Sequence, residues 1–234
     1  MKKRKGATHV AVVLSFIIFI TFLIFVYSYL VQPNLVQKNN GVVIESLKSK
    51  IVENVSKELT IISVKTESAP QDCIKLDSFI STFGIDSRVA VKDGSGTTQT
   101  FYVVGSNLEI SRSGGGTFFK VYHSDEFEPA SSQGESPCNP RNYDKGLVKK
   151  EKYVFENEIK NLISEYNESY NSIKENLGVP AGSEFGFGFE YSNGTEIKTE
   201  RDSFSENVYS KRFPVIYTDN DSNIKFGFII INLW

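Results

Sequence analysis

The sequence predicts an α+β protein with one N-terminal transmembrane helix. Three observations support this fold class: an uninterrupted apolar run from Val10 to Val31, two later segments with apolar residues at helical spacing, and many short β-rich runs separated by turn residues. The expected order is a membrane helix and an amphipathic helix, then an antiparallel β-rich lobe and a helix-plus-antiparallel-sheet lobe.

The apolar run is long enough to cross a bilayer, because a membrane-spanning helix needs about 20 apolar residues. A cleavable secretory signal has a shorter apolar region followed by a small-x-small site, whereas this run ends in Tyr29-Leu-Val-Gln-Pro33. Lys2, Lys3, Arg4 and Lys5 precede the helix, and basic residues hold that end of a membrane helix in the cytoplasm. We therefore expect a single-pass protein of the cell membrane, with most of the chain extracytoplasmic.

The net charge argues against nucleic acid as a partner. The whole chain carries −2, and taking away the four positive charges of Lys2 to Lys5 leaves −6 for the remainder. A mildly acidic outer region is a poor ligand for a polyanion.

The N-terminal residues Lys3-Arg4-Lys5-Gly6, followed by Ala7-Thr8-His9-Val10 and the apolar helix, resemble the class III signal of type IV pilins and archaeal pilin-like proteins. The resemblance covers only the first 30 residues or so. It implies that a prepilin-type peptidase cuts between Gly6 and Ala7 on the cytoplasmic side and that the retained helix packs against related subunits. Many pilins carry a glutamate at the fifth mature position, where this chain has Ala11.

Beyond the membrane, Gln32-Pro33 and Asn39-Asn40-Gly41 predict a kink or a pause in the helix. An amphipathic stalk helix follows, with apolar residues three or four apart and lysines on the other side, and then a strand at Ile61–Thr66. The apolar positions of this helix are Val43 or Ile44, Leu47, Ile51, Val55 and Leu59.

Residues 73–123 predict an antiparallel meander, because alternating runs are separated by Asp93–Gly96, Gly105–Asn107 and Ser113–Gly116. The four expected strands are 87–92, 98–104, 108–111 and 117–122. Residues from Asp125 to Gly146 are rich in Pro, Ser, Gly and Asn, which predicts a loop.

The C-terminal part begins with the clearest helical pattern, which stops at Gly178 and Pro180. Its apolar positions are Val154 or Phe155, Ile159, Leu162, Tyr166, Tyr170, Ile173 and Leu177. Phe185, Phe187, Phe189 and Tyr191 then share one face of a strand that turns into 195–198. A hairpin of 207–217 and 223–234 ends the chain.

These elements give the following division. The expected segments are a basic cytoplasmic leader (1–9), the transmembrane or pilin-like helix (10–31), a stalk helix (32–59), a β-rich lobe (60–124), a linker loop (125–148) and an α+β lobe (149–234). The outer region fits either one domain or two.

Cys73 and Cys138 are the only cysteines, and an even pair outside the cytoplasm predicts a disulfide. The closed loop of about 65 residues corresponds to roughly 4 kcal/mol in the chain-entropy estimate. Two unpaired thiols are the alternative. Four sequons mark candidate N-glycosylation sites at Asn54, Asn167, Asn193 and Asn220.

The polar and aromatic motifs favour structural interpretations over reactive chemistry. His123, Ser124 and Asp125 are sequence neighbours, whereas members of a catalytic triad meet through the fold. Asp219-x-Asp221-x-Asn223 resembles the start of a calcium loop, but Ile224 and Ile230 stand where that loop needs glycine and glutamate. The Phe185–Tyr191 stripe fits a core better than a sugar-stacking surface. We expect no enzyme, no metal and no cofactor.

The sequence thus favours a membrane-anchored, pilin-like surface protein with a role in cell-surface assembly or adhesion. Its partners would be membrane lipid, pilin-type subunits and the processing peptidase. The alternative is a single-pass anchored module that binds a ligand or partner without assembling.

Overall fold

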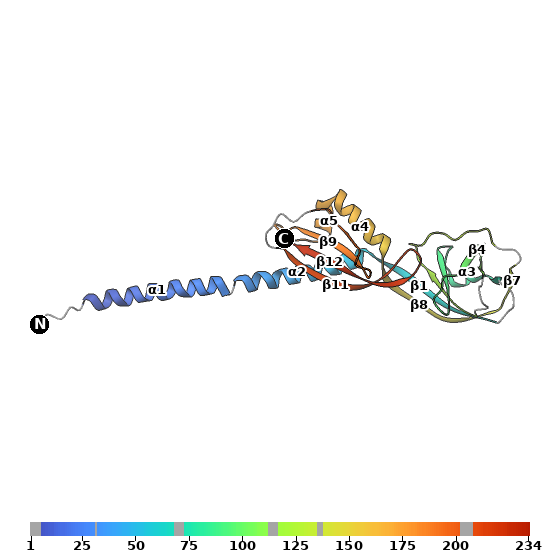
Figure 1. The fold of residues 1–234 in the computed structure, drawn as a ribbon, viewed down its shortest axis with the longest axis horizontal. Coiled ribbons are helices and arrows are strands. Elements are labelled where there is room, and N and C mark those ends of the chain that lie inside the picture. The colour runs from blue at the N-terminus through green and yellow to red at the C-terminus, as the bar shows by residue number, and fades with distance from the viewer. Residues whose placement is uncertain (1–5, 31, 68–72, 112–116, 135–137, 202–207) are drawn as a thin grey trace.

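The structure, a computed structural model, describes residues 6–30, 32–67, 73–111, 117–134, 138–201 and 208–234. For residues 6–9, 28–30 and 32–39 it describes the backbone only. The molecule is an elongated α+β protein in which a long N-terminal rod leads into a two-lobed head (Figure 1).

In the residues that the structure describes, the rod comprises the helical segments α1 (Gly6–Leu30) and α2 (Gln32–Asn54). The expected interruption at Gln32-Pro33 stays a prediction, because residue 31 lies outside the described residues and the positions on both sides of it are helical. The second expected interruption, at Asn39-Asn40-Gly41, is wrong, since all three residues are helical within α2. The stalk helix also ends earlier than residue 59, because Ser56 already begins β1.

Within the described residues, twelve strands form two sheets. The larger sheet has the order β10-β9-β12-β11-β8-β1-β6-β3, and the smaller has the order β4-β5-β2-β7. Their bounds are β1 (Ser56–Thr66), β2 (Cys73–Leu76), β3 (Val89–Asp93), β4 (Thr100–Val104), β5 (Asn107–Ser111), β6 (Phe118–His123), β7 (Asn139–Pro140), β8 (Tyr143–Phe155), β9 (Phe185–Tyr191), β10 (Glu196–Lys198), β11 (Tyr209–Thr218) and β12 (Ile224–Leu233).

The distal lobe, farthest from α1, is a two-layer sandwich. The small sheet and the short helix α3 (Phe79–Phe83) pack on β1, β3 and β6, with Ile62, Val64, Ile74, Phe79 and Phe119 in the core. The expected single meander is therefore wrong: β4 and β5 pair with each other in the small sheet, while β3 and β6 pair with each other in the large one. The local turns were predictable, but the assignment of hairpins to sheets depends on which apolar faces meet.

The proximal lobe, next to α1, is a sheet covered on one face by helices. The covering elements are the C-terminal half of α2, α4 (Glu156–Glu168) and α5 (Tyr170–Asn176), which share a core with β9, β11 and β12. In place of one continuous helix from Val154 to Leu177, the chain has a strand up to Phe155 and a helix break at Ser169. The C-terminal hairpin β11–β12 and the β9–β10 hairpin are confirmed.

The expected linker at 125–148 is wrong in its last part. Residues 139–140 form β7, and β8 begins at Tyr143 and runs antiparallel to β1 along most of the distal lobe. The sequence of this strand, with its lysines and Gly146, does not have the pattern typical of a strand. Its side chains from Asp144 to Lys152 are exposed and show no alternation of polar and apolar residues. The two lobes meet where Tyr217 and Thr218 pair with Val154 and Phe155.

Candidate functional site

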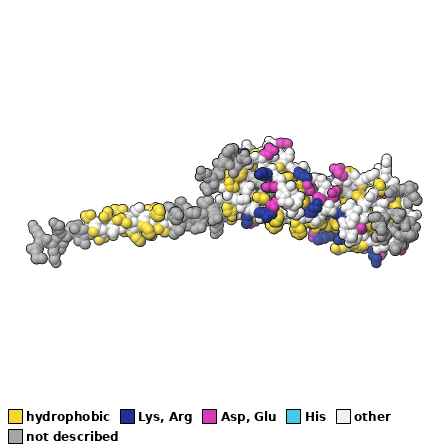
Figure 2. Space-filling model, in the orientation of Figure 1, with side chains coloured by type: hydrophobic (Ala, Val, Ile, Leu, Met, Phe, Trp, Pro, Cys, Tyr) yellow, Lys and Arg dark blue, Asp and Glu magenta, His cyan; other side chains and the backbone are white. Residues whose placement is uncertain are grey.

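The exposed apolar surface of α1 is the most prominent feature of the molecule. Its segment Val10–Tyr27 is long and apolar enough to cross a membrane, and none of it is buried. Figure 2 shows this part of the rod covered by hydrophobic side chains. A surface of this kind needs a cover such as lipid or other helices, because water solvates it poorly.

The expected processing site lies at the start of this helix. Gly6 is the first residue of α1 and Ala7 the second, and the structure describes only their backbone. The basic cluster Lys2 to Lys5 lies outside the described residues.

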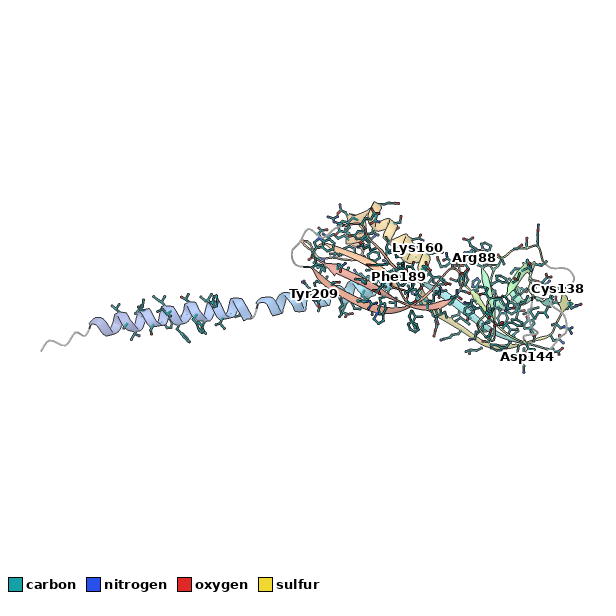
Figure 3. All side chains as sticks on the ribbon, in the orientation of Figure 1. Arg88, Cys138, Asp144, Lys160, Phe189 and Tyr209 are labelled. Atoms are coloured by element: carbon teal, nitrogen blue, oxygen red, sulfur yellow. A yellow bond between two sulfur atoms is a disulfide. The ribbon has the colours of Figure 1, made fainter. Side chains whose placement is uncertain are left out.

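The disulfide between Cys73 and Cys138 is present, with the two Cα atoms 4.9 Å apart. Cys138 lies at the end of the molecule farthest from α1 (Figure 3). The neighbouring residues add strand pairing, since Asn139 and Pro140 lie parallel to Ile74 and Lys75. The bond therefore attaches the segment before β8 to the small sheet.

His123, Ser124 and Asp125 do not form a catalytic triad. The Ser124 hydroxyl is buried and donates a hydrogen bond of 2.9 Å to the backbone oxygen of Glu58. The His123 ring instead contacts the carboxylate of Asp86, with Nε2 3.1 Å from Oδ1. The serine is thus used to hold the loop after β6 against β1.

Asp86, His123 and Asp125 lie close enough together to be tested as metal ligands. Arg88 already binds both carboxylates, at 3.1 Å from Asp86 and 3.4 Å from Asp125. Burial acts to raise the pKa of Asp86, but the Arg88 N–H, the His123 ring and the Arg88 charge outweigh it and keep that pKa below its ordinary value. A cation would have to displace this guanidinium, so the arrangement is that of a surface ion-pair network.

The turn Asp219–Ser222 has the polar hairpin structure expected from the sequence. The carboxylate of Asp219 accepts hydrogen bonds from the backbone N–H groups of Asp221 and Asn223, and the amine of Lys225 lies 2.6 Å from Oδ2. Burial acts to raise the pKa of Asp219, whereas Lys225 and Asn223 lower it more strongly, so the net shift is downward. The ammonium group of Lys225 therefore supplies the positive charge that a cation would bring.

The glycine-rich turn and the aromatic stripe are structural as well. At Asp93–Gly96 the Asp93 carboxylate accepts the N–H groups of Ser95 and Thr97. The turn at 113–116 lies outside the described residues. Phe185 and Phe187 are buried against Tyr166 of α4, and Phe189 is buried against Tyr217 of β11, so the core interpretation is confirmed.

All four sequon asparagines are exposed. Asn193 lies in the β9–β10 turn, where its Oδ1 accepts the N–H and the hydroxyl of Thr195. Asn167 Oδ1 accepts the N–H of Glu200 at 3.1 Å. Asn54 borders an open polar cleft of about 450 Å³ between α4 and α5. The four asparagines stay candidate glycosylation sites.

One surface was missed by the sequence analysis. The outward side of the β11–β12 hairpin exposes Pro214, Ile216, Ile224 and Phe226. A signal was present in the run Phe226–Ile231, because a strand apolar on both faces is typical of one covered on both sides.

Comparison of the chain with models of known protein families, with curated proteins and with solved structures found no match in any of the three.

Proposed function

We propose that the protein is a membrane-anchored, pilin-like surface protein, with α1 in the bilayer and the head outside the cytoplasm, where it takes part in cell-surface assembly or adhesion without catalysis. The observation that carries this proposal is that none of the apolar segment Val10–Tyr27 is buried, although the head beside it has its own cores.

The proposed orientation has two independent supports. The basic residues Lys2 to Lys5 favour a cytoplasmic N-terminus. The disulfide between Cys73 and Cys138 suits an oxidising compartment, because cytosolic thiols are kept reduced.

The absence of catalysis is proposed from the roles of the polar groups. The carboxylate of Asp86 is paired with Arg88 and contacts the His123 ring, and Ser124 and Asp219 hold backbone groups of loops. A general base needs a substrate-facing position, and these groups are engaged in bonds that fix the fold.

Cleavage after Gly6 and packing of α1 against related subunits form the finer part of the proposal. Both follow from the resemblance of the N-terminal residues to class III signals. Ala11, where many pilins have glutamate, favours the alternative of an anchored binding module that does not assemble.

The test is N-terminal sequencing of the protein extracted from membranes of the native host. We expect the mature chain to begin at Ala7 and the Gly6→Val variant to keep residues 1–6, with Val10→Leu as a matched control that is still cut. Protease added to intact cells should digest the head. An intact Met1 together with no sedimenting polymer in detergent-free fractions would favour the alternative, and a protected head would contradict the orientation.

A further inference from the structure

The β11–β12 hairpin has one covered face and one open face. Its inner side chains, among them Phe213, Tyr217, Ile229 and Ile231, are buried in the proximal core. Its outer side chains include six apolar residues that we call the outer patch. The outer patch consists of Pro214, Ile216, Ile224, Phe226, Phe228 and Ile230.

The strand register makes the outer patch continuous. Ile216 lies opposite Phe226, and Pro214 lies opposite Phe228. Directly opposed side chains on one face of an antiparallel pair have Cβ atoms about 5 Å apart. Phe226 is 67% exposed, which is unusual for a phenylalanine within a sheet.

The border of the outer patch carries both signs of charge. The Arg212 guanidinium lies 3.4 Å from the centroid of the Phe228 ring and 2.7 Å from a carboxylate oxygen of Glu190. Because these two charges already neutralise each other, two such surfaces can approach without opposing unpaired like charges.

We propose that the outer patch is the surface through which two copies of this chain associate side by side in one membrane. The inference rests on the membrane anchoring proposed above but not on cleavage after Gly6. Two copies in one bilayer must be related by an axis along the membrane normal, which is the direction of α1. The strands β11 and β12 extend roughly along the same long axis as α1 (Figure 1), so a two-fold axis along that direction lets the open faces pack as aligned sheets.

The unpaired edge of β8 does not provide this contact. In the described residues β8 pairs with β11 only at Val154 and Phe155, which leaves its outer edge open. β8 also runs along the long axis of the molecule (Figure 1), so antiparallel pairing of two such edges would point the two α1 helices in opposite directions. A β-bulge opposite Ser63 and the exposed Lys149, Lys150 and Lys152 further protect this edge, whose lower end carries Asp144 in Figure 3.

The size of the outer patch determines where association is detectable. Six side chains at these exposures offer on the order of 400 Å² per copy, about half of what each partner contributes to a stable interface. The contact is therefore weak between separate molecules in solution. Anchoring in one bilayer raises the effective concentration and makes it observable.

The first experiment places a photoreactive benzoylphenylalanine at position 226 of the full-length protein in proteoliposomes. Illumination should yield a covalent dimer. The matched control carries the same group at Leu147, which is equally exposed at 70% but lies on β8, and should yield at least about tenfold less dimer. Equal yields from both positions would contradict the proposal, as would no dimer from position 226.

The second experiment measures the dimer fraction in dilute proteoliposomes by single-molecule photobleaching. Phe226→Asp should lower that fraction about tenfold, and Leu147→Asp should leave it unchanged. An intact Cys73–Cys138 bond and unchanged circular dichroism report the fold. Repeating the measurement in native membranes separates the two proposals. Dimers of chains that still begin at Met1 would support association through the outer patch and refute cleavage after Gly6. Cleaved chains that remain monomeric would refute only association through the outer patch. In the same membranes, cross-linking from position 226 only to a different protein would refute the second copy as the occupant.

Discussion

The amine of Lys92 on β3 donates a hydrogen bond of 2.6 Å to the side-chain oxygen of Asn223, at the tip of the β11–β12 hairpin 131 positions away in the sequence. The bond connects the distal lobe to the proximal lobe beside the short β8–β11 pairing. Burial lowers the pKa of Lys92, and the nearby carboxylates of Asp219 and Asp221 partly oppose this effect. Because the Lys92 side chain is largely buried, the loss of this hydrogen bond would weaken the contact between the lobes.

We expect Asn223→Ala to lower the free energy of unfolding by about 1–3 kcal/mol, because the buried Lys92 amine loses its acceptor. Urea unfolding of the detergent-solubilised full chain measures the change. Asn171→Ala, at an exposed position on α5, is the control and should stay within about 0.5 kcal/mol of the parent. Equal effects of the two substitutions would show that the lobes are not held together at this point.

The C-terminal half of α2 should behave as part of the folded head. Leu47 is fully buried against the proximal sheet, whereas Val42 on the same helix is 66% exposed. We expect Leu47→Ala to cost about 2–5 kcal/mol by leaving a cavity, and Val42→Ala to cost less than about 0.5 kcal/mol. The same unfolding assay compares them, and a neutral Leu47→Ala would mean that α2 is a free stalk.

Removing the disulfide should destabilise the distal lobe. The paired Cys73→Ser and Cys138→Ser substitutions open a loop spanning 65 positions, for which we expect a loss of up to roughly 4 kcal/mol. Calorimetry under non-reducing conditions measures it, and peptide mass spectrometry of the parent verifies the bond. The parent treated with reductant is the control and should match the double variant. Free thiols in the parent, or an unchanged transition, would contradict the prediction.

Acid should weaken the contact between α5 and the start of β9. Hydrogen bonds from Lys174 and Tyr170 lower the pKa of Glu184, and the charge of Arg201 adds to the effect. A carboxylate whose folded pKa is depressed stabilises the fold above its ordinary pKa, and that stabilisation is lost as the pH falls through the folded value. We therefore expect the parent to lose stability below about pH 4.

Glu184→Gln should flatten this part of the pH profile, because the amide does not titrate. Thermal unfolding between pH 3 and 7 compares the two proteins, with Glu175→Gln on the exposed side of α5 as the control. A profile of Glu184→Gln parallel to that of the parent would rule out this carboxylate as a source of the acid sensitivity.

Local sequence patterns were sufficient to predict those elements whose structure depends on residues close together in the chain. The hairpin of β11 and β12 follows from two apolar runs around Asp219–Ser222, and the apolar faces of α2 and α4 from their helical spacing. Cys73 and Cys138 were paired correctly because the chain offers no other combination.

Contacts between distant segments were not encoded in this way. The first part of β8, up to residue 148, has the composition of a loop because its exposed side chains show no alternation of polar and apolar residues, and only the pairing with β1 makes it a strand. The residues that resemble a single meander belong to two sheets. Apolar side chains of β3 and β6 lie beside Ile62 and Val64 of β1 on one face of the large sheet, and β4 and β5 of the small sheet cover that face. Likewise, the ring of His123 contacts the carboxylate of Asp86, which is distant in the sequence.

The α+β class and the apolar helix near the N-terminus can be derived from the residues alone, because hydrophobic length and periodicity depend on residues close together in the chain. The hydrogen bond between Lys92 and Asn223 and the exposure of Phe226 become visible only in the folded chain. Which apolar face is covered depends on how segments more than a hundred residues apart pack, and no local pattern carries that information.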